Sequence, residues 1–209
     1  KINVKKNNIY VGYNLRFHPG VLFLRKLLIK NNPIDIKIIT NSYLPNWRND
    51  KYSSSYSANK KKGGGVILDL SHEVDLALWL FGEIKISFVR FGKQSNLKIS
   101  SEDNLKLFGK IKNANFYLDL SYYSKNEIRN IYIDTNKNSL FLDLKNNLIK
   151  INNTKKNFFP DDINQSYLNM HEAIILKKNA KYLCKIDQGR KVLDVITRIK
   201  KFKLKEVVK

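Results

Sequence analysis

The stretch from residue 84 to residue 151 constrains the fold of this 209-residue chain more than any other part. It is a series of short segments rich in β-branched, aromatic and alternating apolar residues, which are typical of strands. Short turns such as Lys112-Asn113 and Asn146-Asn147 separate them. We expect strands at Ile84–Phe91, Leu105–Ile111, Asn115–Tyr123, Ile128–Asp134, Ser139–Leu144 and Leu148–Ile151. Because no helix-length segment lies between them to form a crossover, these strands should pair antiparallel.

Helical patterns stand on both sides of this stretch. Apolar spacing of three and four residues predicts helices at Val21–Leu28, Val66–Phe81, Ile163–Lys178 and Gln188–Lys203, and further strands are expected at Ile9–Asn14 and Ile34–Ile39. Residues 45–62 have no periodicity and predict a long loop. No repeat or second boundary is visible, so we predict one domain over residues 1–209. Its class is α+β, a mostly antiparallel β-sheet with helices packed on one face.

Residue counts exclude several classes of protein. The single cysteine, Cys184, excludes an intramolecular disulfide framework and a cysteine-rich zinc site. Three histidines leave little room for a histidine-based metal site, so no metal is expected. No apolar run approaches the roughly 20 residues of a membrane span, and the first residues lack the apolar core of a signal peptide. We therefore expect a soluble, cytoplasmic protein with no membrane partner.

The net charge of +21 raises the alternative of a non-catalytic basic module that binds nucleic acid or anionic surfaces. Only seven of the 39 basic residues are Arg, the residue that favours bidentate contacts with phosphate and guanine. The lysines are spread along the chain, and their densest run is Lys60-Lys61-Lys62. This distribution favours a solvated surface over a specific nucleic-acid site, and it predicts weak polyanion binding that salt abolishes.

The predicted helix Val66–Phe81 holds the strongest functional signal in the residues. Its apolar stripe, which should pack on the sheet, is Ile67, Leu70, Val74, Ala77, Leu78 and Phe81. Asp69 and His72 lie on the opposite side, three residues apart, and Asp75 lies to one side. A carboxylate at His72 Nδ1 would fix the tautomer and leave Nε2 for a substrate. The alternative is a solvated helix face with no chemical role.

Three glycines, Gly63-Gly64-Gly65, precede this helix and permit close approach of another backbone or of a ligand. A glycine run of this kind is also typical of a flexible loop. The sequence contains no GxGxxG, P-loop or HExxH motif. Ser71 and His72 are adjacent on the helix and therefore cannot face each other as nucleophile and base. Cys184 is expected in the core, and His171 on the surface.

Taken together, several motifs resemble one known family. They are Tyr13 to Pro19 (YNLRFHP), Trp47-Arg48, Gly63 to Asp75 (GGGVILDLSHEVD) and Trp79 to Gly82 (WLFG), with Glu102-Asp103, Arg129 to Ile133 and Asp187 to Leu193 in agreement. The combination resembles the C-terminal domain of the Gfo/Idh/MocA oxidoreductases, over nearly the whole chain. The resemblance implies the α+β fold of dihydrodipicolinate-reductase-like C-terminal domains.

The resemblance also implies a function and partners. Family members use NAD or NADP to oxidise or reduce a hydroxyl or carbonyl of a sugar, cyclitol or sugar nucleotide. Their N-terminal Rossmann domain binds the cofactor, and nothing in this sequence matches it. We therefore expect the chain to be the substrate-binding and oligomerisation part of a longer enzyme. The expected partners are a sugar-type substrate and further copies of the chain, in a homodimer or homotetramer built through the sheet face.

Site residues carry over from the resemblance position by position. His72 is the family's histidine near the reacting hydroxyl, and Asp69 corresponds to its site aspartate. Asp69 and His72 are three residues apart, whereas the family's usual spacing is four, so the resemblance assigns His72 more directly. Asn14 and Arg16 stand where substrate-facing residues follow the first strand. Trp47 and Tyr56, in the long loop, could cover the sugar.

Overall fold

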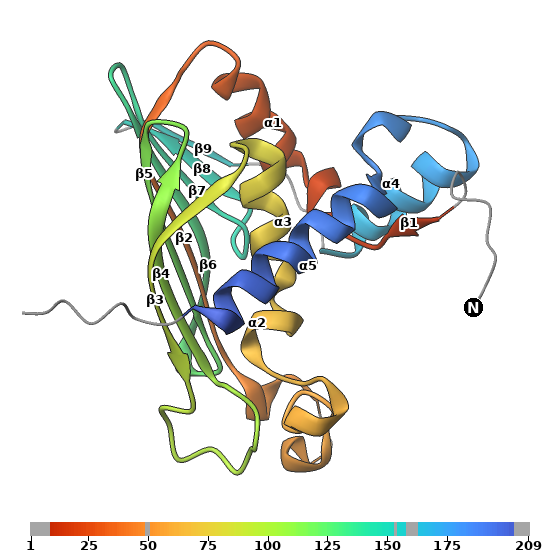
Figure 1. Ribbon diagram of the computed structural model, residues 1–209. Helices are drawn as coiled ribbons and strands as arrows, with labels where there is room; N and C mark the ends of the chain where they lie inside the picture. The colour runs from red at the N-terminus through yellow and green to blue at the C-terminus, as the bar shows by residue number, and fades with distance from the viewer. Residues whose placement is uncertain (1–8, 49–50, 153, 158–162, 203–209) are drawn as a thin grey trace, which may run out of the picture.

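The computed structural model describes residues 9–48, 51–152, 154–157 and 163–202. Its main feature is an eight-stranded sheet with helices on one side (Figure 1). The strands follow the order β3-β4-β5-β2-β6-β7-β8-β9. Their bounds are β2 Pro33–Tyr43, β3 Ile84–Gly92, β4 Asn104–Ile111, β5 Ala114–Ser121, β6 Tyr123–Thr135, β7 Ser139–Asp143, β8 Leu148–Ile151 and β9 Thr154–Asn157. The predicted α+β class is confirmed.

The sheet is mixed because β2 enters its centre from outside the meander. β2 pairs parallel with β5 on one side and antiparallel with β6 on the other. All other neighbours in the sheet are antiparallel. Two α-helices, three 3₁₀ helices and the strands β3 and β4 lie between β2 and β5 in the chain, which gives the crossover that a parallel pair requires.

Alternation along the strands determines which face is buried. In β2, Ile36 and Ile38 are buried while Lys37 between them is exposed. Leu107 and Leu118, partners in the β4–β5 register, are likewise fully buried. Because side chains point to opposite faces at every second residue, one face carries the core and the other faces outward.

Four longer helices accompany the sheet: α1 Pro19–Leu28, α3 Ser71–Leu80, α4 Ile163–Ile175 and α5 Ile186–Lys201. Three of them, α1, α3 and α5, cover the core face, whereas α4 lies to the side with the two-stranded β1–β10 sheet (Figure 1). His18 begins α1 as its N-cap, and its Nδ1 accepts a hydrogen bond of 3.1 Å from the backbone N–H of Gly20. β1 is Tyr10–Val11 and β10 is Cys184–Lys185.

Some of the predicted elements differ from the structure. The strand expected at Ile9–Asn14 is only Tyr10–Val11, because the chain turns into the 3₁₀ helix η2, Asn14–Phe17. The expected loop at 45–62 contains three 3₁₀ helices, η3 Leu44–Asn46, η4 Tyr52–Ser54 and η5 Lys60–Lys62. Single 3₁₀ turns leave no apolar periodicity in a sequence, so this pattern could not predict them.

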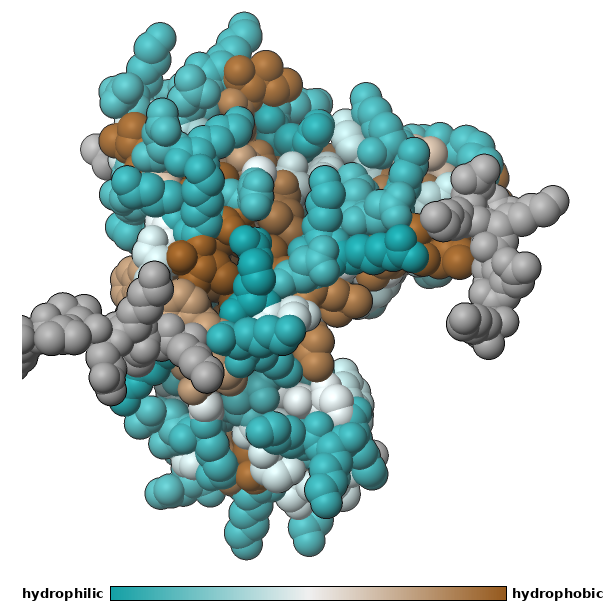
Figure 2. Space-filling model, in the orientation of Figure 1, coloured by the Kyte–Doolittle hydropathy of each residue, from teal (hydrophilic) through white to brown (hydrophobic). Residues whose placement is uncertain are grey.

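Most of the surface in the view of Figure 2 is hydrophilic, and hydrophobic groups show mainly in its middle, where the helices meet the sheet. The helices among the described residues are all too short or too polar to cross a membrane. No cluster of three or more metal-ligating side chains is present within the described ranges.

Candidate functional site

The predicted helix 66–81 is two helices, and the break positions the candidate site. α2 spans Val66–Asp69, α3 begins at Ser71, and Leu70 between them has φ −98° and ψ 28°. The prediction of one continuous helix over residues 66–81 is therefore wrong. Breaking the helix at Leu70 changes the relative direction of the side chains on its two sides, so the angles expected for one helix no longer hold for Asp69 and His72.

Two of the three glycines before α2, Gly64 and Gly65, fill a steric role. A Cβ on Gly64 would overlap the backbone carbonyls of Tyr56 and Ser57, and a Cβ on Gly65 would overlap the Glu102 carboxylate. Gly65 also has φ +130°, a conformation that other residues rarely adopt. The close approach predicted from the glycines is therefore that of the chain's own loop and of Glu102. These groups fill the space beside Gly64 and Gly65 that a ligand would need.

Asp69, at the end of α2, lies in a cluster of aromatic residues. Its Oδ2 accepts a short hydrogen bond from the hydroxyl of Tyr122, which follows β5. The Trp47 ring meets the Tyr122 ring edge-on at 5.1 Å. Burial, together with the Asp69 carboxylate, raises the pKa of both Tyr122 and Tyr56. Three of the predicted site residues, Trp47, Tyr56 and Asp69, are thus brought together around Tyr122.

His72, in the first turn of α3, is mostly enclosed. Its ring meets the Tyr13 ring edge-on at 5.3 Å. Burial lowers the pKa of the imidazole below its ordinary 6.5. The Arg129 cation acts in the same direction, and the Glu73 and Asp69 carboxylates oppose it. The imidazole is therefore neutral at pH 7 and able to accept a proton.

The predicted hydrogen bond between Asp69 and His72 does not form. His72 Nδ1 is buried without a hydrogen-bond partner among the described residues, and Asp69 Oδ2 is used by Tyr122. The next residue, Glu73, is fully buried, and its Oε1 accepts hydrogen bonds of 2.9 and 2.6 Å from Arg129. Glu73 Oε2 also lacks a partner in the described structure. Unpaired buried polar atoms are uncommon, and two on consecutive residues mark this turn as unusual.

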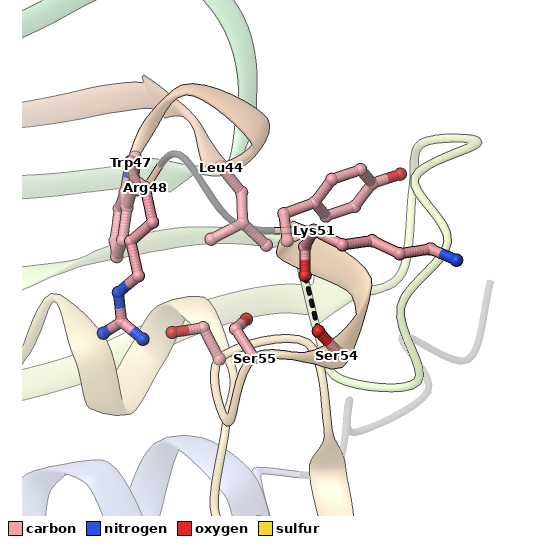
Figure 3. Close-up of a pocket in the computed structure, with 8 residues that line it drawn as sticks. Leu44, Trp47, Arg48, Lys51, Ser54 and Ser55 are labelled. Carbon is pink, nitrogen blue, oxygen red and sulfur yellow. Dashed lines mark hydrogen bonds between the residues drawn. The ribbon is translucent and has the colours of Figure 1, made fainter.

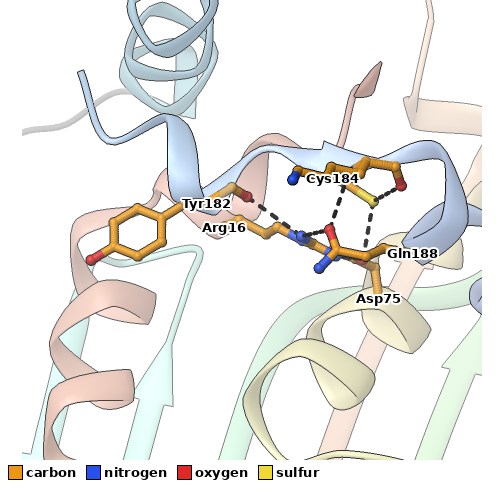
Figure 4. Close-up of polar contacts among 6 residues, drawn as sticks. Arg16, Asp75, Tyr182, Cys184 and Gln188 are labelled. Carbon is orange, nitrogen blue, oxygen red and sulfur yellow. Dashed lines mark hydrogen bonds and ion pairs between the residues drawn. The ribbon is translucent and has the colours of Figure 1, made fainter. Parts of the chain in front are cut away.

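The structure assigns Arg16 to the core, in contrast to the predicted substrate contact. Arg16 is 2% exposed and forms a bidentate ion pair with Asp75, at 2.9 and 2.6 Å. Its remaining nitrogen donates to Gln188 Oε1 at 3.0 Å and to the Tyr182 carbonyl (Figure 4). Every donor nitrogen of Arg16 is thus engaged inside the protein, and its predicted substrate contact stays a prediction. Asp75, expected on a polar face, is buried for the same reason.

Asn14 is also inside the protein. It is 2% exposed, and its Nδ2 donates to Ser166 Oγ on α4 at 2.6 Å. Its amide therefore links η2 to α4, and the predicted contact of Asn14 with a substrate stays a prediction. Cys184 lies beside the Arg16–Asp75 pair, and burial raises the pKa of its thiol to about 12, which leaves it unreactive in the core as expected.

A pocket of about 190 Å³ adjoins the aromatic cluster. We call it the Trp47 pocket. Its lining includes Trp47, Arg48, Lys51, Tyr52, Ser55 and Ser57 (Figure 3). The Arg48 guanidinium lies 5.5 Å from the centre of the Tyr56 ring, so one side chain joins the pocket to the Asp69 cluster.

Two residues of the site were not predicted as site residues, Tyr122 and Glu73. Tyr122 stands between two strands with no motif around it, and it reaches Asp69 across a separation of 53 residues. Glu73 belongs to the recognised motif, but its ion pair with Arg129 on β6 spans 56 residues. The packing of α2 and α3 against the sheet brings these partners together, so spacing in the sequence carried no signal for them.

The comparison with known families agrees with this architecture. Residues 26–133 match the Gfo/Idh/MocA C-terminal family, described as "Oxidoreductase family, C-terminal alpha/beta domain". The chain belongs to this family. A search of curated proteins found no significant match.

Solved structures with the same fold include several dehydrogenases. The chain is similar to UDP-N-acetylglucosamine 3-dehydrogenase of Acidithiobacillus ferrooxidans, with a TM-score of 0.70 and 19% identity over 90% of this chain and 59% of that one. It is similar to an inositol dehydrogenase homologue complexed with NAD⁺ from Azotobacter vinelandii, with a TM-score of 0.72 and 14% identity over 92% and 62%. The WlbA dehydrogenase of Thermus thermophilus, in complex with NAD and UDP-GlcNAcA, has a TM-score of 0.61 and 16% identity over 94% and 56%.

These likenesses concern the fold, and the chain spans about three fifths of the length of the structures it matches.

The described residues do not fit a dinucleotide. A Rossmann cradle needs a parallel strand, a glycine-rich turn with open space and a helix. Here the glycine-rich turn is occupied by Glu102 and by the Tyr56–Ser57 backbone, and the sheet is mostly antiparallel. We assign no described residue to cofactor binding.

Proposed function

We propose that this chain is the substrate-binding and oligomerisation part of an NAD(P)-dependent oxidoreductase that acts on a hydroxyl or carbonyl of a sugar, cyclitol or sugar nucleotide. The family match over residues 26–133 supports the reaction class. The single structural observation that carries the proposal is His72, a mostly buried and neutral imidazole at the break between α2 and α3. The hydride chemistry would belong to NAD or NADP, bound mainly by a Rossmann domain outside this chain.

His72 is proposed to act on the proton of the reacting hydroxyl. With Nδ1 buried, Nε2 is the nitrogen left to face a substrate. A neutral imidazole accepts a proton from a hydroxyl during oxidation and returns it during reduction. Asp69, held by Tyr122, is proposed to bind a substrate hydroxyl with its carboxylate rather than to orient the imidazole. Trp47 and Tyr56 then contribute aromatic surface around the sugar.

Replacing His72 tests this proposal in the complete enzyme. We expect His72→Ala to lower kcat by about 100-fold, the usual contribution of a general acid or base. The measurement is nicotinamide absorbance with sugars, cyclitols and sugar nucleotides as substrates. His171→Ala is the matched control, because His171 is exposed on α4 and should leave the rate unchanged. A rate that His72→Ala does not alter would remove His72 from the chemistry.

A further inference from the structure

The Trp47 pocket presents positive charge, and the described residues that line it include no carboxylate. Arg48 is exposed and forms no ion pair with any described residue, and the same is true of Lys51. Elsewhere in the described structure, the carboxylates of Asp75, Glu73 and Asp119 each have a basic partner. An unpaired guanidinium beside a pocket favours an anionic ligand.

Hydroxyl groups beside Arg48 add hydrogen-bond donors. Ser55 Oγ accepts a hydrogen bond of 3.3 Å from the Ala58 backbone, so its own proton remains free to donate. Ser57 is 1% exposed, and its Oγ has no hydrogen-bond partner among the described residues. Ser54, by contrast, donates its proton to the Lys51 carbonyl at 2.7 Å and is not available. Figure 3 shows the Arg48 guanidinium and Ser55 on the same side of Leu44, while the Lys51 ammonium extends away.

The size and place of the pocket limit what it can hold. At about 190 Å³ it is smaller than the roughly 300 Å³ at which pockets for whole drug-sized ligands begin, so it suits one part of a ligand. Trp47 lines it and also contacts Tyr122, which donates to Asp69. Arg48 lies over the Tyr56 ring, beside the same cluster. A ligand that reaches from the pocket to His72 therefore carries its negative charge at the end away from the reacting carbon.

We infer that the Trp47 pocket binds the phosphates of a nucleoside diphosphate sugar, with Arg48 as the main ligand of the diphosphate and Ser55 and Ser57 as hydrogen-bond donors. This inference rests on the proposed function and narrows its substrate class to sugar nucleotides. Trp47 and Tyr52 supply flat apolar surface at the edge of the diphosphate. Arg48 is a specificity residue under this assignment, and it takes no part in hydride or proton transfer.

The test compares Arg48→Gln with the unaltered complete enzyme. UDP-N-acetylglucosamine and phosphate-free N-acetylglucosamine are the probe substrates, and UDP binding is measured by calorimetry at about 0.15 M salt. Loss of a charged hydrogen-bond donor should raise KM for the sugar nucleotide and weaken UDP binding by about 10- to 100-fold, with kcat changed less than about twofold. Ser55→Ala should weaken UDP binding by about three- to tenfold. Arg190→Gln, an exposed charge loss on α5, is the matched control and should change nothing.

Four results would overturn the inference. UDP affinity unchanged in Arg48→Gln is the first, and equal weakening by Arg190→Gln, a sign of general polyanion binding, is the second. A raised KM for NAD(P) alone would assign the diphosphate to the cofactor, and equally efficient use of the phosphate-free sugar would remove the need for phosphate recognition. Hydride transfer that depends on His72 without UDP binding would leave the proposed function standing. Arg48-dependent UDP binding without any sugar oxidation would sustain the pocket assignment alone.

Discussion

At the residue scale, His72 is kept neutral by its surroundings. Tyr13 contacts the ring, Nδ1 is buried, and Arg129 lies close enough to disfavour a second positive charge. Glu73 would favour the charged form, but Arg129 donates two hydrogen bonds to its Oε1 and offsets its field. The net result is an imidazole that holds its proton less firmly than one in water, which suits a group that must accept and release a proton near pH 7.

The lowered pKa of His72 predicts a pH dependence of stability. In the unfolded chain His72 takes up a proton near pH 6.5, whereas the folded protein resists protonation until a lower pH. The unfolded state therefore binds more protons below pH 6.5, and the free energy of unfolding falls as pH falls through this window, by at most about 1.4 kcal/mol per pH unit from this group. Urea unfolding between pH 7 and pH 5 should show a shallower dependence for His72→Gln.

His171→Gln is the control for this prediction, because His171 is exposed on α4. It should retain the slope of the unaltered protein. If His72→Gln and the unaltered protein lose stability in parallel as pH falls, then His72 is not protonated less readily in the folded state.

At the element scale, the position of α2 and of the break that follows it depends on how the glycines before α2 pack against their neighbours. Gly64 lies against the Tyr56–Ser57 backbone, and Gly65 lies against Glu102 with φ +130°. The backbone N–H of Val66 donates to the Glu102 carbonyl at 3.0 Å, which ties the start of α2 to the entry of β4. The glycines therefore fix the position from which Asp69 reaches Tyr122.

Replacing Gly65 should disturb this packing. Gly65→Ala places a Cβ against the Glu102 carboxylate and forces a side chain onto a strained φ, so we expect at least about 2 kcal/mol of lost stability in urea unfolding. Gly12→Ala is the matched control, because no atom lies within 4 Å of its added Cβ and its change should stay within about 0.5 kcal/mol. Equal effects of the two changes would show that close packing at Gly65 does not matter.

At the scale of the whole molecule, the outward face of the sheet carries aromatic side chains. Phe108 is 49% exposed, and its ring lies 6.2 Å from Phe88 and 4.7 Å from Tyr117. On β6 and β7, which β2 separates from β5, the rings of Tyr132 and Phe141 contact each other at 4.8 Å. Neighbouring exposed rings on one sheet face are typical of an interface between copies of a chain, which supports the proposed homodimer or homotetramer through the sheet face.

The proposed interface predicts the effect of a charge on this face. Phe108→Glu should lower the molecular mass in light scattering, because it would bury a carboxylate between copies. Leu193→Glu is the control, since Leu193 is 53% exposed on α5 in the opposite layer. A mass that stays the same in Phe108→Glu would contradict association through the sheet face.

Local pattern by itself determined the strands β2 to β8 and most of the helices, whereas the edge strand β9 was not predicted. The alternation in β2 and the three-and-four spacing in α5 predict which side chains point inward, and the buried residues of both elements agree. The place of Cys184 in the core also follows from local chemistry. The family resemblance supplied His72, Asp69, Trp47, Tyr56, Arg16 and Asn14 as site residues, and these assignments stay predictions. The structure adds that Arg16 and Asn14 are buried and hydrogen-bonded inside the protein.

Only the tertiary structure decided which distant residues meet. Arg16 and Asp75 are 59 positions apart, and their ion pair forms because η2 and α3 pack together. The same holds for Tyr122 with Asp69 and for the parallel pairing of β2 with β5. Periodicity encodes the direction of a side chain relative to its own element, whereas a contact depends on where the chain returns after tens of residues. Which distant residues make contact is therefore a property of the packed molecule, and local spacing in the sequence does not contain it.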